Sequence, residues 1–221
     1  MTQQWFDVER YYTDLLVGPD PALDAAMRAI DAAGLPKISV SPNEGKFLHL
    51  LAKISGARRV LEIGTLGVYS TIWLARALPK DGRLITLEAE PKHAAVAQSN
   101  FARAGLAGVV EIITAPALET LPRLASEKRG PFDLFFIDAD KASTAEYFTW
   151  SLKLSRPGSV IVVDNVVRKG AVIDAKSTDR DVQGIRRFNE LLSKEKRVTA
   201  TALQTVGSKG YDGFTLAVVR E

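Results

Sequence analysis

The chain of 221 residues contains no cysteine and only two histidines, His49 and His93. The first absence excludes disulfides and thiolate metal sites, and the second argues against a histidine-based zinc site or catalytic triad. No apolar run approaches the roughly 20 residues that a membrane span needs, and residues 1–5 lack the basic start and apolar core of a signal peptide. We therefore expect a cytoplasmic protein without a membrane partner.

A strong net charge is missing as well. The formal net charge is +3, and the basic clusters Arg186–Arg187 and Lys194–Arg197 are mixed with acidic residues. Such clusters are typical of solvated helix faces, so we do not expect a nucleic-acid partner. With 46% apolar and 25% charged residues, the composition is that of a globular protein. The length predicts one domain over residues 1–221, with a helical segment at 1–56 and an α/β core at 57–221.

Two common phosphate-binding patterns are also absent, the dinucleotide pattern G-x-G-x-x-G and the Walker pattern of triphosphate-binding loops. In their place, residues 60–70 contain an apolar run with Glu62, a turn with Gly64 and Gly67, and a helix start at Ser70. This order predicts a strand, a tight turn and a helix, and glycine there lets the backbone approach a ligand at the end of the strand. The alternative is that the two glycines only form the turn.

A second apolar run, residues 83–87, ends in Glu88. An acid at the tip of the second strand is placed to bind two ribose hydroxyls. Together with the turn, Glu88 predicts a nucleoside cofactor that lacks a pyrophosphate, and S-adenosylmethionine is such a cofactor. Its positively charged ammonium and sulfonium would favour nearby carboxylates such as Glu62.

From Arg59 onward, predicted strands and helices alternate along the chain, and residues 41–44 before them form the pattern of a capping box at a helix start. Nearly continuous apolar runs such as residues 159–163 are typical of parallel strands covered on both faces. The β-like runs 198–206 and 214–219 are close enough in sequence to pair antiparallel. We therefore predict a doubly wound α/β fold, with a mostly parallel, Rossmann-like sheet, an antiparallel edge and added N-terminal helices. Strands are expected near 59–63, 83–88, 109–114, 132–138 and 158–164, and helices near 69–78, 91–104, 117–127 and 141–154.

Acidic and amide side chains follow two of these strands. Asp138 ends the fourth predicted strand, and Asp164 and Asn165 end the fifth. Ligands of such sheets bind outside the carboxyl ends of the strands, and two carboxylates with an amide oxygen suit Mg²⁺, which keeps positions for water or substrate oxygens. The alternative is that these acids cap the helices or loops that follow.

Lys141 lies three residues after Asp138, in the expected first turn of a helix. A free lysine is a poor base at neutral pH. A nearby dication would favour its neutral form and would also acidify a coordinated hydroxyl. A lysine beside a metal is thus a way to deprotonate a phenol, and the alternative is an ordinary surface lysine.

Together these blocks resemble the metal-dependent, class I S-adenosylmethionine O-methyltransferases, the caffeoyl-CoA O-methyltransferase family related to catechol O-methyltransferase. The resemblance covers nearly the whole chain, the N-terminal helices included. It is carried by residues 61–65 with 69–70, 115–117, 137–141, 164–167 and 211–216. The first block departs from the commoner pattern, in which glycine immediately precedes the tyrosine: here Val68 precedes Tyr69, and the glycine lies one place earlier.

The resemblance implies a role for each matched residue. The cofactor-contacting positions are Val40, Glu62, Gly64, Thr65, Ser70, Glu88, Ala117, Asp138 and Asp140. Asp138, Asp164 and Asn165 match the ligands of Mg²⁺, or of another divalent cation such as Mn²⁺ or Ca²⁺. Lys141 matches the base, with Asp138 beside it in the catalytic site. Lys169 and Arg180 lie near positions used for substrate, and the family's N-terminal helices commonly help to build a homodimer.

The expected reaction is methyl transfer from S-adenosylmethionine to one hydroxyl of a catechol-like phenolic small molecule, a vicinal dihydroxy aromatic, with help from the divalent metal. Trp5, Tyr11, Tyr12 and Trp150 are candidates for an aromatic wall, although core or interface packing is the commoner role of any one of them. Two alternatives remain at this point. One is an α/β oxidoreductase, which the missing glycine pattern disfavours. The other is a methyltransferase-like fold that binds a ligand without turnover.

Overall fold

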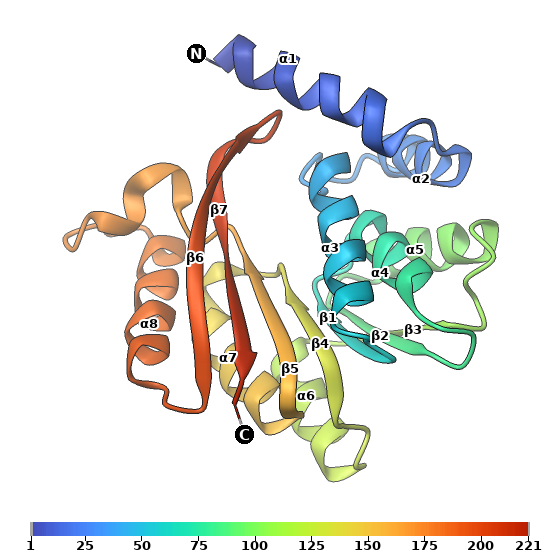
Figure 1. The fold of residues 1–221 in the computed structure, drawn as a ribbon. Coiled ribbons are helices and arrows are strands. Elements are labelled where there is room, and N and C mark those ends of the chain that lie inside the picture. Colours follow the sequence, from blue (N-terminus) through green and yellow to red (C-terminus); the bar gives the residue numbers. More distant parts are fainter. Residues whose placement is uncertain (1, 221) are drawn as a thin grey trace.

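The computed structural model describes residues 2–220, which form a seven-stranded sheet flanked by helices (Figure 1). The strand order is β3-β2-β1-β4-β5-β7-β6. The first five strands of this order run parallel, whereas β7 pairs antiparallel with both β5 and β6. The predicted doubly wound fold with an antiparallel edge is confirmed.

The strands are β1 Arg59–Ile63, β2 Arg83–Glu88, β3 Val110–Thr114, β4 Phe132–Ile137, β5 Ser155–Asp164, β6 Val198–Gly207 and β7 Gly210–Val219. The helices are α1 Thr2–Tyr12, the π-turn η1 Thr13–Val17, α2 Pro21–Ala32, α3 Pro42–Ile54, α4 Tyr69–Ala77, α5 Pro91–Arg103, α6 Ala117–Ser126, the 3₁₀ turn η2 Lys141–Ser143, α7 Thr144–Lys153, the 3₁₀ segment η3 Arg168–Ile173 and α8 Arg180–Lys194.

The parallel strands are buried on both faces because successive side chains point to opposite sides of the sheet. Val60 packs into a cluster with residues of α2 to α5, and its neighbour Leu61 packs into a second cluster with residues of α6 to α8. Full burial of such a side chain contributes roughly 1.5–3 kcal/mol. These two cores hold the carboxyl ends of β1, β2, β4 and β5 at one edge of the sheet.

The N-terminal helices pack differently from the rest. Helix α3 starts with the predicted capping box, in which Ser41 and Glu44 each accept a backbone N–H from the other. Helix α2 buries Leu23 and Ile30 against the core. Helix α1 instead lies across the top of the molecule, above the tip of the β6–β7 hairpin (Figure 1).

Three element boundaries differ from the predicted ones. The helix expected from residue 141 begins with the short turn η2, because Asp140 caps Ser143 and α7 starts only at Thr144. Strand β5 begins at Ser155. Strand β7 begins at Gly210, since the ladder with β6 continues to Gly207 and leaves a loop of two residues. Over the described part of the chain, the helices fall short of the length and apolarity that a bilayer crossing requires.

Candidate functional site

The turn after β1 brings two strand ends into close contact. Gly64 has a φ of 98°, and its N–H donates to the carbonyl of Leu87 at 3.0 Å. A Cβ at this position would lie 2.2 Å from the carbonyl oxygen of Asp138. Only glycine therefore allows β1 and β4 to end side by side.

The departure at Val68 has a packing explanation. Val68 is fully buried and has a left-handed backbone with a φ of 83°, a conformation that is unfavourable for a β-branched residue. A Cβ on Gly67 would lie 2.0 Å from Cγ1 of Ile30. Helix α2 thus requires glycine at position 67, and the valine takes the left-handed turn that follows.

A cavity of about 550 Å³, here called the inner cavity, opens beside this turn. It is lined by all the residues that match cofactor-contacting positions except Glu62: Val40, Gly64, Thr65, Ser70, Glu88, Ala117, Asp138 and Asp140. Glu88 accepts N–H bonds from Leu66 at 2.8 Å and from Glu90 at 2.9 Å. Oε1 also lies 3.5 Å from Nδ1 of His93, whereas Oε2 keeps a further lone pair that can accept a ligand hydroxyl.

Glu62 lies beneath the inner cavity rather than on its wall. Its side chain is 0% exposed and accepts hydrogen bonds from the hydroxyls of Ser70, Thr71 and Thr86. Burial raises the pKa of Glu62 to about 7, although these hydrogen bonds act in the opposite direction. The Glu62 carboxylate thus fixes Ser70 from beneath the inner cavity, and Ser70 itself lines that cavity.

The ends of β4 and β5 bring the other predicted residues together. Lys141 is only 6% exposed, and its Nζ donates to Oδ1 of Asp138 at 2.7 Å. It is therefore a buried, paired lysine and not a surface lysine. Burial, and then the negative charge of Asp138, raise the pKa of Asp164 to about 8.

These side chains fit a divalent cation by charge and by donor type. Asp138 and Asp164 supply carboxylate oxygens and Asn165 supplies an amide oxygen, which are the ligand atoms that Mg²⁺ prefers. The raised pKa of Asp164 is caused first by burial and then by the charge of Asp138. Within residues 2–220, no three histidine, cysteine, aspartate or glutamate side chains gather closely enough to hold a metal. Water or substrate oxygens would have to complete the coordination.

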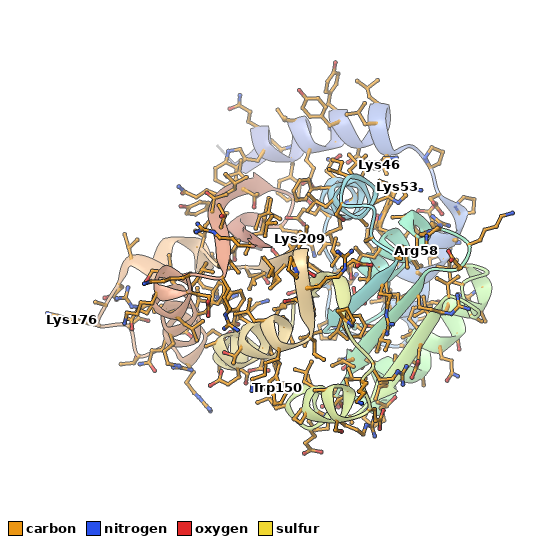
Figure 2. The ribbon with its side chains drawn as sticks, turned by 60° about the horizontal axis from the view of Figure 1, so that its bottom comes forward. Lys46, Lys53, Arg58, Trp150, Lys176 and Lys209 are labelled. Atoms are coloured by element: carbon orange, nitrogen blue, oxygen red, sulfur yellow. The ribbon has the colours of Figure 1, made fainter. Side chains whose placement is uncertain are left out.

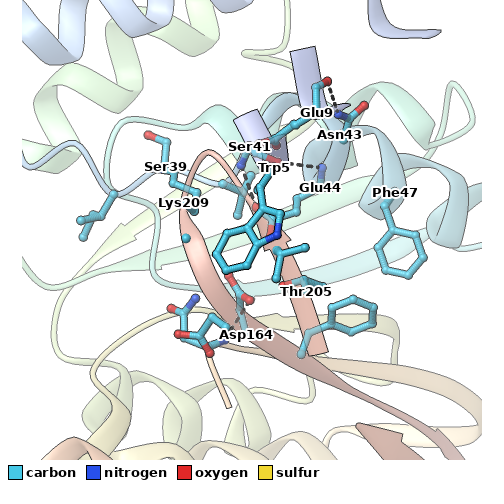
Figure 3. Close-up of a pocket in the computed structure, with 18 of the residues that line it drawn as sticks. Trp5, Glu9, Ser39, Ser41, Asn43, Glu44, Phe47, Asp164, Thr205 and Lys209 are labelled. Atoms are coloured by element: carbon cyan, nitrogen blue, oxygen red, sulfur yellow. Dashed lines mark hydrogen bonds between the residues drawn. The ribbon is translucent and has the colours of Figure 1, made fainter. Parts of the chain in front are cut away.

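A larger cavity of about 980 Å³, here called the outer cavity, adjoins the inner one. Asp164 lines it, and both cavities share Ile38, Ser39, Val40, Asn165 and Arg168. Helix α1 contributes Trp5 and Tyr12 to the lining. Figure 3 shows Trp5 among the residues that line this cavity. The two cavities thus meet where the oxygen donors lie.

The predicted aromatic wall is only partly correct. Trp5 and Tyr12 line the outer cavity, but Tyr11 is 60% exposed, and Trp150 packs on α7 beneath Lys153. Figure 2 shows Trp150 at the opposite side of the molecule from α1. Two further aromatic rings line the outer cavity, although the sequence did not single them out. They are Phe47 and Phe214, whose ring centroids are 5.0 Å apart.

Other lining residues were not predicted either. Tyr147 lines the inner cavity and donates its hydroxyl to Asp140, which therefore has a fixed carboxylate. The Ser39 hydroxyl is buried without a hydrogen-bond partner among the described residues. Of the two loosely matched basic residues, Lys169 lines the outer cavity, whereas Arg180 lies outside both linings. Ser39 directly precedes Val40, and Arg168 directly follows the block of residues 164–167; these positions were the only signal in the sequence for the two residues.

Comparisons with known proteins agree with this geometry. The family model of O-methyltransferases matches residues 20–219. A catechol O-methyltransferase of Niastella koreensis is 58% identical over 221 residues, which cover all of both chains. An O-methyltransferase of Bacillus cereus, solved with SAH, is 57% identical with a TM-score of 0.98 over all of both chains. TomG of Streptomyces achromogenes, an O-methyltransferase involved in tomaymycin synthesis and solved with SAM, is 54% identical, with a TM-score of 0.96 over 100% of this chain and 99% of TomG.

Proposed function

The chain belongs to the O-methyltransferase family and depends on S-adenosylmethionine, and we propose that it methylates one hydroxyl of a catechol-like acceptor with the help of a divalent metal. The observation that carries this proposal is the pair of adjoining cavities, which meet at the oxygen donors on the ends of β4 and β5. Membership of this family excludes the two alternatives that the sequence left open, an α/β oxidoreductase and a methyltransferase-like fold that binds a ligand without turnover.

The inner cavity is the proposed cofactor site. Glu88 binds the ribose, because its carboxylate is held by two backbone N–H groups and still has a free lone pair on Oε2. Asp138 and Asp140 face the positively charged amino-acid tail. Val40, Gly64, Thr65, Ser70 and Ala117 complete the wall, and Glu62 acts from below through Ser70.

Asp138, Asp164 and Asn165 are the proposed ligands of Mg²⁺, or of Mn²⁺ or Ca²⁺. When bound there, the cation supplies a positive charge that orients both acceptor hydroxyls and favours loss of a proton from one of them. The outer cavity holds the acceptor ring, and Trp5, Phe47 and Phe214 supply apolar surface for it.

Lys141 is the proposed base. Its amine lies on the carboxylate of Asp138, at the junction of strand end and cofactor cavity. In its neutral form, which a nearby dication would favour, the amine accepts the proton from the reacting hydroxyl, and Asp138 stabilises the ammonium that results. The remaining acceleration comes from holding sulfur, methyl carbon and oxygen in line and from excluding water.

We further propose that the whole chain acts as one unit and forms a homodimer through α1. Phe6, Tyr11, Leu15 and Leu16 are between 47% and 63% exposed on α1 and the turn after it. Large apolar side chains that are exposed on one segment are typical of an interface. Light scattering of the purified protein tests this assembly directly.

The central test is a turnover assay on a panel of catechols and monophenols, with S-adenosylmethionine, in EDTA and after Mg²⁺ is returned. We expect methylated catechols only when the metal is present. Methylation of monophenols at an equal rate in EDTA would overturn both the acceptor class and the metal.

A further inference from the structure

Helix α8 carries a glycine that rests on the backbone of the proposed base. Gly184 is buried in the interior of α8, where glycine is less favourable than alanine because it loses more conformational freedom on folding. A Cβ at this position would lie 2.1 Å from the carbonyl oxygen of Lys141 and 2.6 Å from the Cα of Ala142. Both are backbone atoms, so no side-chain rotation relieves the contact. Only glycine therefore lets α8 lie this close to the turn η2.

A hydrogen bond joins the same two segments. Arg187 lies three residues after Gly184, and therefore on the same face of α8. Its guanidinium donates to the carbonyl oxygen of Ala142 at 2.7 Å. The turn η2 thus meets α8 at two adjacent points, since Gly184 sets how closely the backbones approach and Arg187 holds them together.

Helix α8 is itself fixed to the sheet. Its residues Ile185 and Phe188 are fully buried in the core cluster that also contains residues of β4 and β5. The ring centroid of Phe188 lies 5.3 Å from that of Phe148 in α7, the helix beside α8 (Figure 1). Because a close-packed core yields little, the surface on which η2 rests has a defined position relative to the strand ends.

Lys141 is fixed at both of its ends. Its Nζ donates to Oδ1 of Asp138 at 2.7 Å, and its carbonyl oxygen accepts the hydroxyl of Thr144 at 3.0 Å. The preceding residue, Asp140, accepts the Ser143 N–H at 3.0 Å. A displacement of η2 therefore either breaks the contact between Nζ and Asp138 or moves the amine relative to an acceptor hydroxyl at the ends of β4 and β5.

We propose that Gly184 and Arg187 are positioning residues for the reaction: through them, α8 sets the place of η2 and so of the Lys141 amine that takes the proton. The inference rests on the proposed function, in which Lys141 is the base. Proton transfer requires the amine to lie within hydrogen-bond reach of the reacting hydroxyl, so a shift of about 1 Å at η2 is enough to slow it. An acceptor that arrives already ionised does not need this transfer and should not respond.

The test measures the single-turnover rate of methyl transfer to catechol and to 4-nitrocatechol, at saturating S-adenosylmethionine and Mg²⁺. We expect Gly184→Ala to lower the rate for catechol roughly 10- to 100-fold, because the added methyl group must push η2 away. Arg187→Met should lower it roughly two- to tenfold, the range for the loss of one hydrogen bond. Arg187→Lys, which keeps a donor, should recover part of that loss. For 4-nitrocatechol, every loss should stay below about twofold.

Gly108→Ala and Arg123→Met are the matched controls. A Cβ on Gly108 would meet no atom within 4 Å, and Arg123 is an exposed arginine of α6 whose loss changes the net charge equally. Both controls should keep the wild-type rates with both acceptors. Urea unfolding shows whether each variant is folded, and if Gly184→Ala is not, the two Arg187 variants decide the question.

The outcomes separate the positioning role from the proposed function. Equal losses for the two acceptors in a folded Gly184→Ala or in Arg187→Met would overturn the positioning role and leave Lys141 as the base. Wild-type rates with both acceptors in Arg187→Met would do the same. Lys141→Met is measured beside these variants: if it also slows both acceptors equally, Lys141 is not the base, and the positioning role falls with it.

Discussion

The inner and outer cavities are built on different principles. The inner cavity is formed by the carboxyl ends of adjacent parallel strands, and close backbone contacts such as that between Gly64 and Asp138 define it. The outer cavity is formed by α1, the α3 region, the segment after β5 and the β6–β7 hairpin, which are far apart in the sequence. One is fixed by the sheet, and the other by contacts among peripheral segments.

From this difference we infer that the inner cavity is common to members of the family, whereas the outer cavity determines which acceptor a single member selects. A cavity specified by strand ends and glycine positions tolerates little change, because a single Cβ would collide with backbone. A cavity specified by a helix and a hairpin tip can change its lining without disturbing the sheet. Variants that disturb one cavity therefore test whether the other cavity responds.

The largest effect is expected where the cavities meet. Asp164→Ala should abolish metal-supported turnover, with a loss of at least about a hundredfold, because a metal ligand on the acceptor side is removed. Cofactor affinity should change little, since Asp164 lines the outer cavity and not the inner one. Asp174→Ala removes a carboxyl group from an exposed loop and is the control. A large loss of cofactor affinity, measured by calorimetry, would show that the cavities are not separable.

Loss of the Lys141 amine should be the next largest effect. Lys141→Met should lower turnover by roughly 10²–10⁴-fold, the usual range for a general base. The defect should shrink for nitrocatechols, which arrive already ionised. A defect of the same size for acceptors of every acidity would mean that Lys141 only positions Asp138, its partner at 2.7 Å.

The fold was predictable because its signals are local. Runs such as residues 159–163 identify parallel strands buried on both faces, and residues 41–44 identify a helix start. The limits of β7 were not predictable, because they depend on a ladder with β6 that continues to Gly207 and Gly210. Likewise, Asp140 caps a short 3₁₀ turn before α7, which helical periodicity does not indicate.

The candidate site was predictable to the extent that its residues end strands. Gly64, Glu88 and Asp138 lie at the carboxyl ends of β1, β2 and β4, so the parallel pairing of these three strands brings them to one edge of the sheet. The lining of the outer cavity gave no such signal. Phe47 and Phe214 are separated by most of the chain, and only the packing of α3 on the sheet makes them neighbours.

A change confined to the inner cavity should affect the cofactor alone. Glu88→Ala should weaken S-adenosylmethionine binding by roughly 1–3 kcal/mol, through lost charged hydrogen bonds to the ribose and a looser turn at Leu66. Glu90→Ala is the matched control, because this exposed acid is two residues away and carries the same charge. An unchanged dissociation constant in Glu88→Ala would show that another group binds the ribose.

The converse change should affect the acceptor alone. Glu9 of α1 accepts the Ser208 N–H at the hairpin tip, so Glu9→Ala should loosen the outer cavity and raise the acceptor KM about three- to tenfold. The dissociation constant of S-adenosylmethionine should stay within about twofold of wild type. Equal effects on both ligands, in steady-state kinetics and calorimetry, would contradict the independence of the two cavities.

The smallest effect is expected at Val68, where strain and packing oppose each other. A left-handed backbone costs an L-residue roughly 1–2 kcal/mol, whereas full burial of a valine side chain contributes roughly 1.5–3 kcal/mol. Val68 has both features. Val68→Ala loses the burial and keeps the strain, but Val68→Gly loses the burial and relieves the strain. The glycine variant should therefore be the more stable of the two by about 1 kcal/mol, the reverse of the usual order of alanine and glycine. Urea unfolding of both variants measures this difference. An alanine variant that is equally or more stable would show that the left-handed conformation at position 68 does not cost the free energy assumed here.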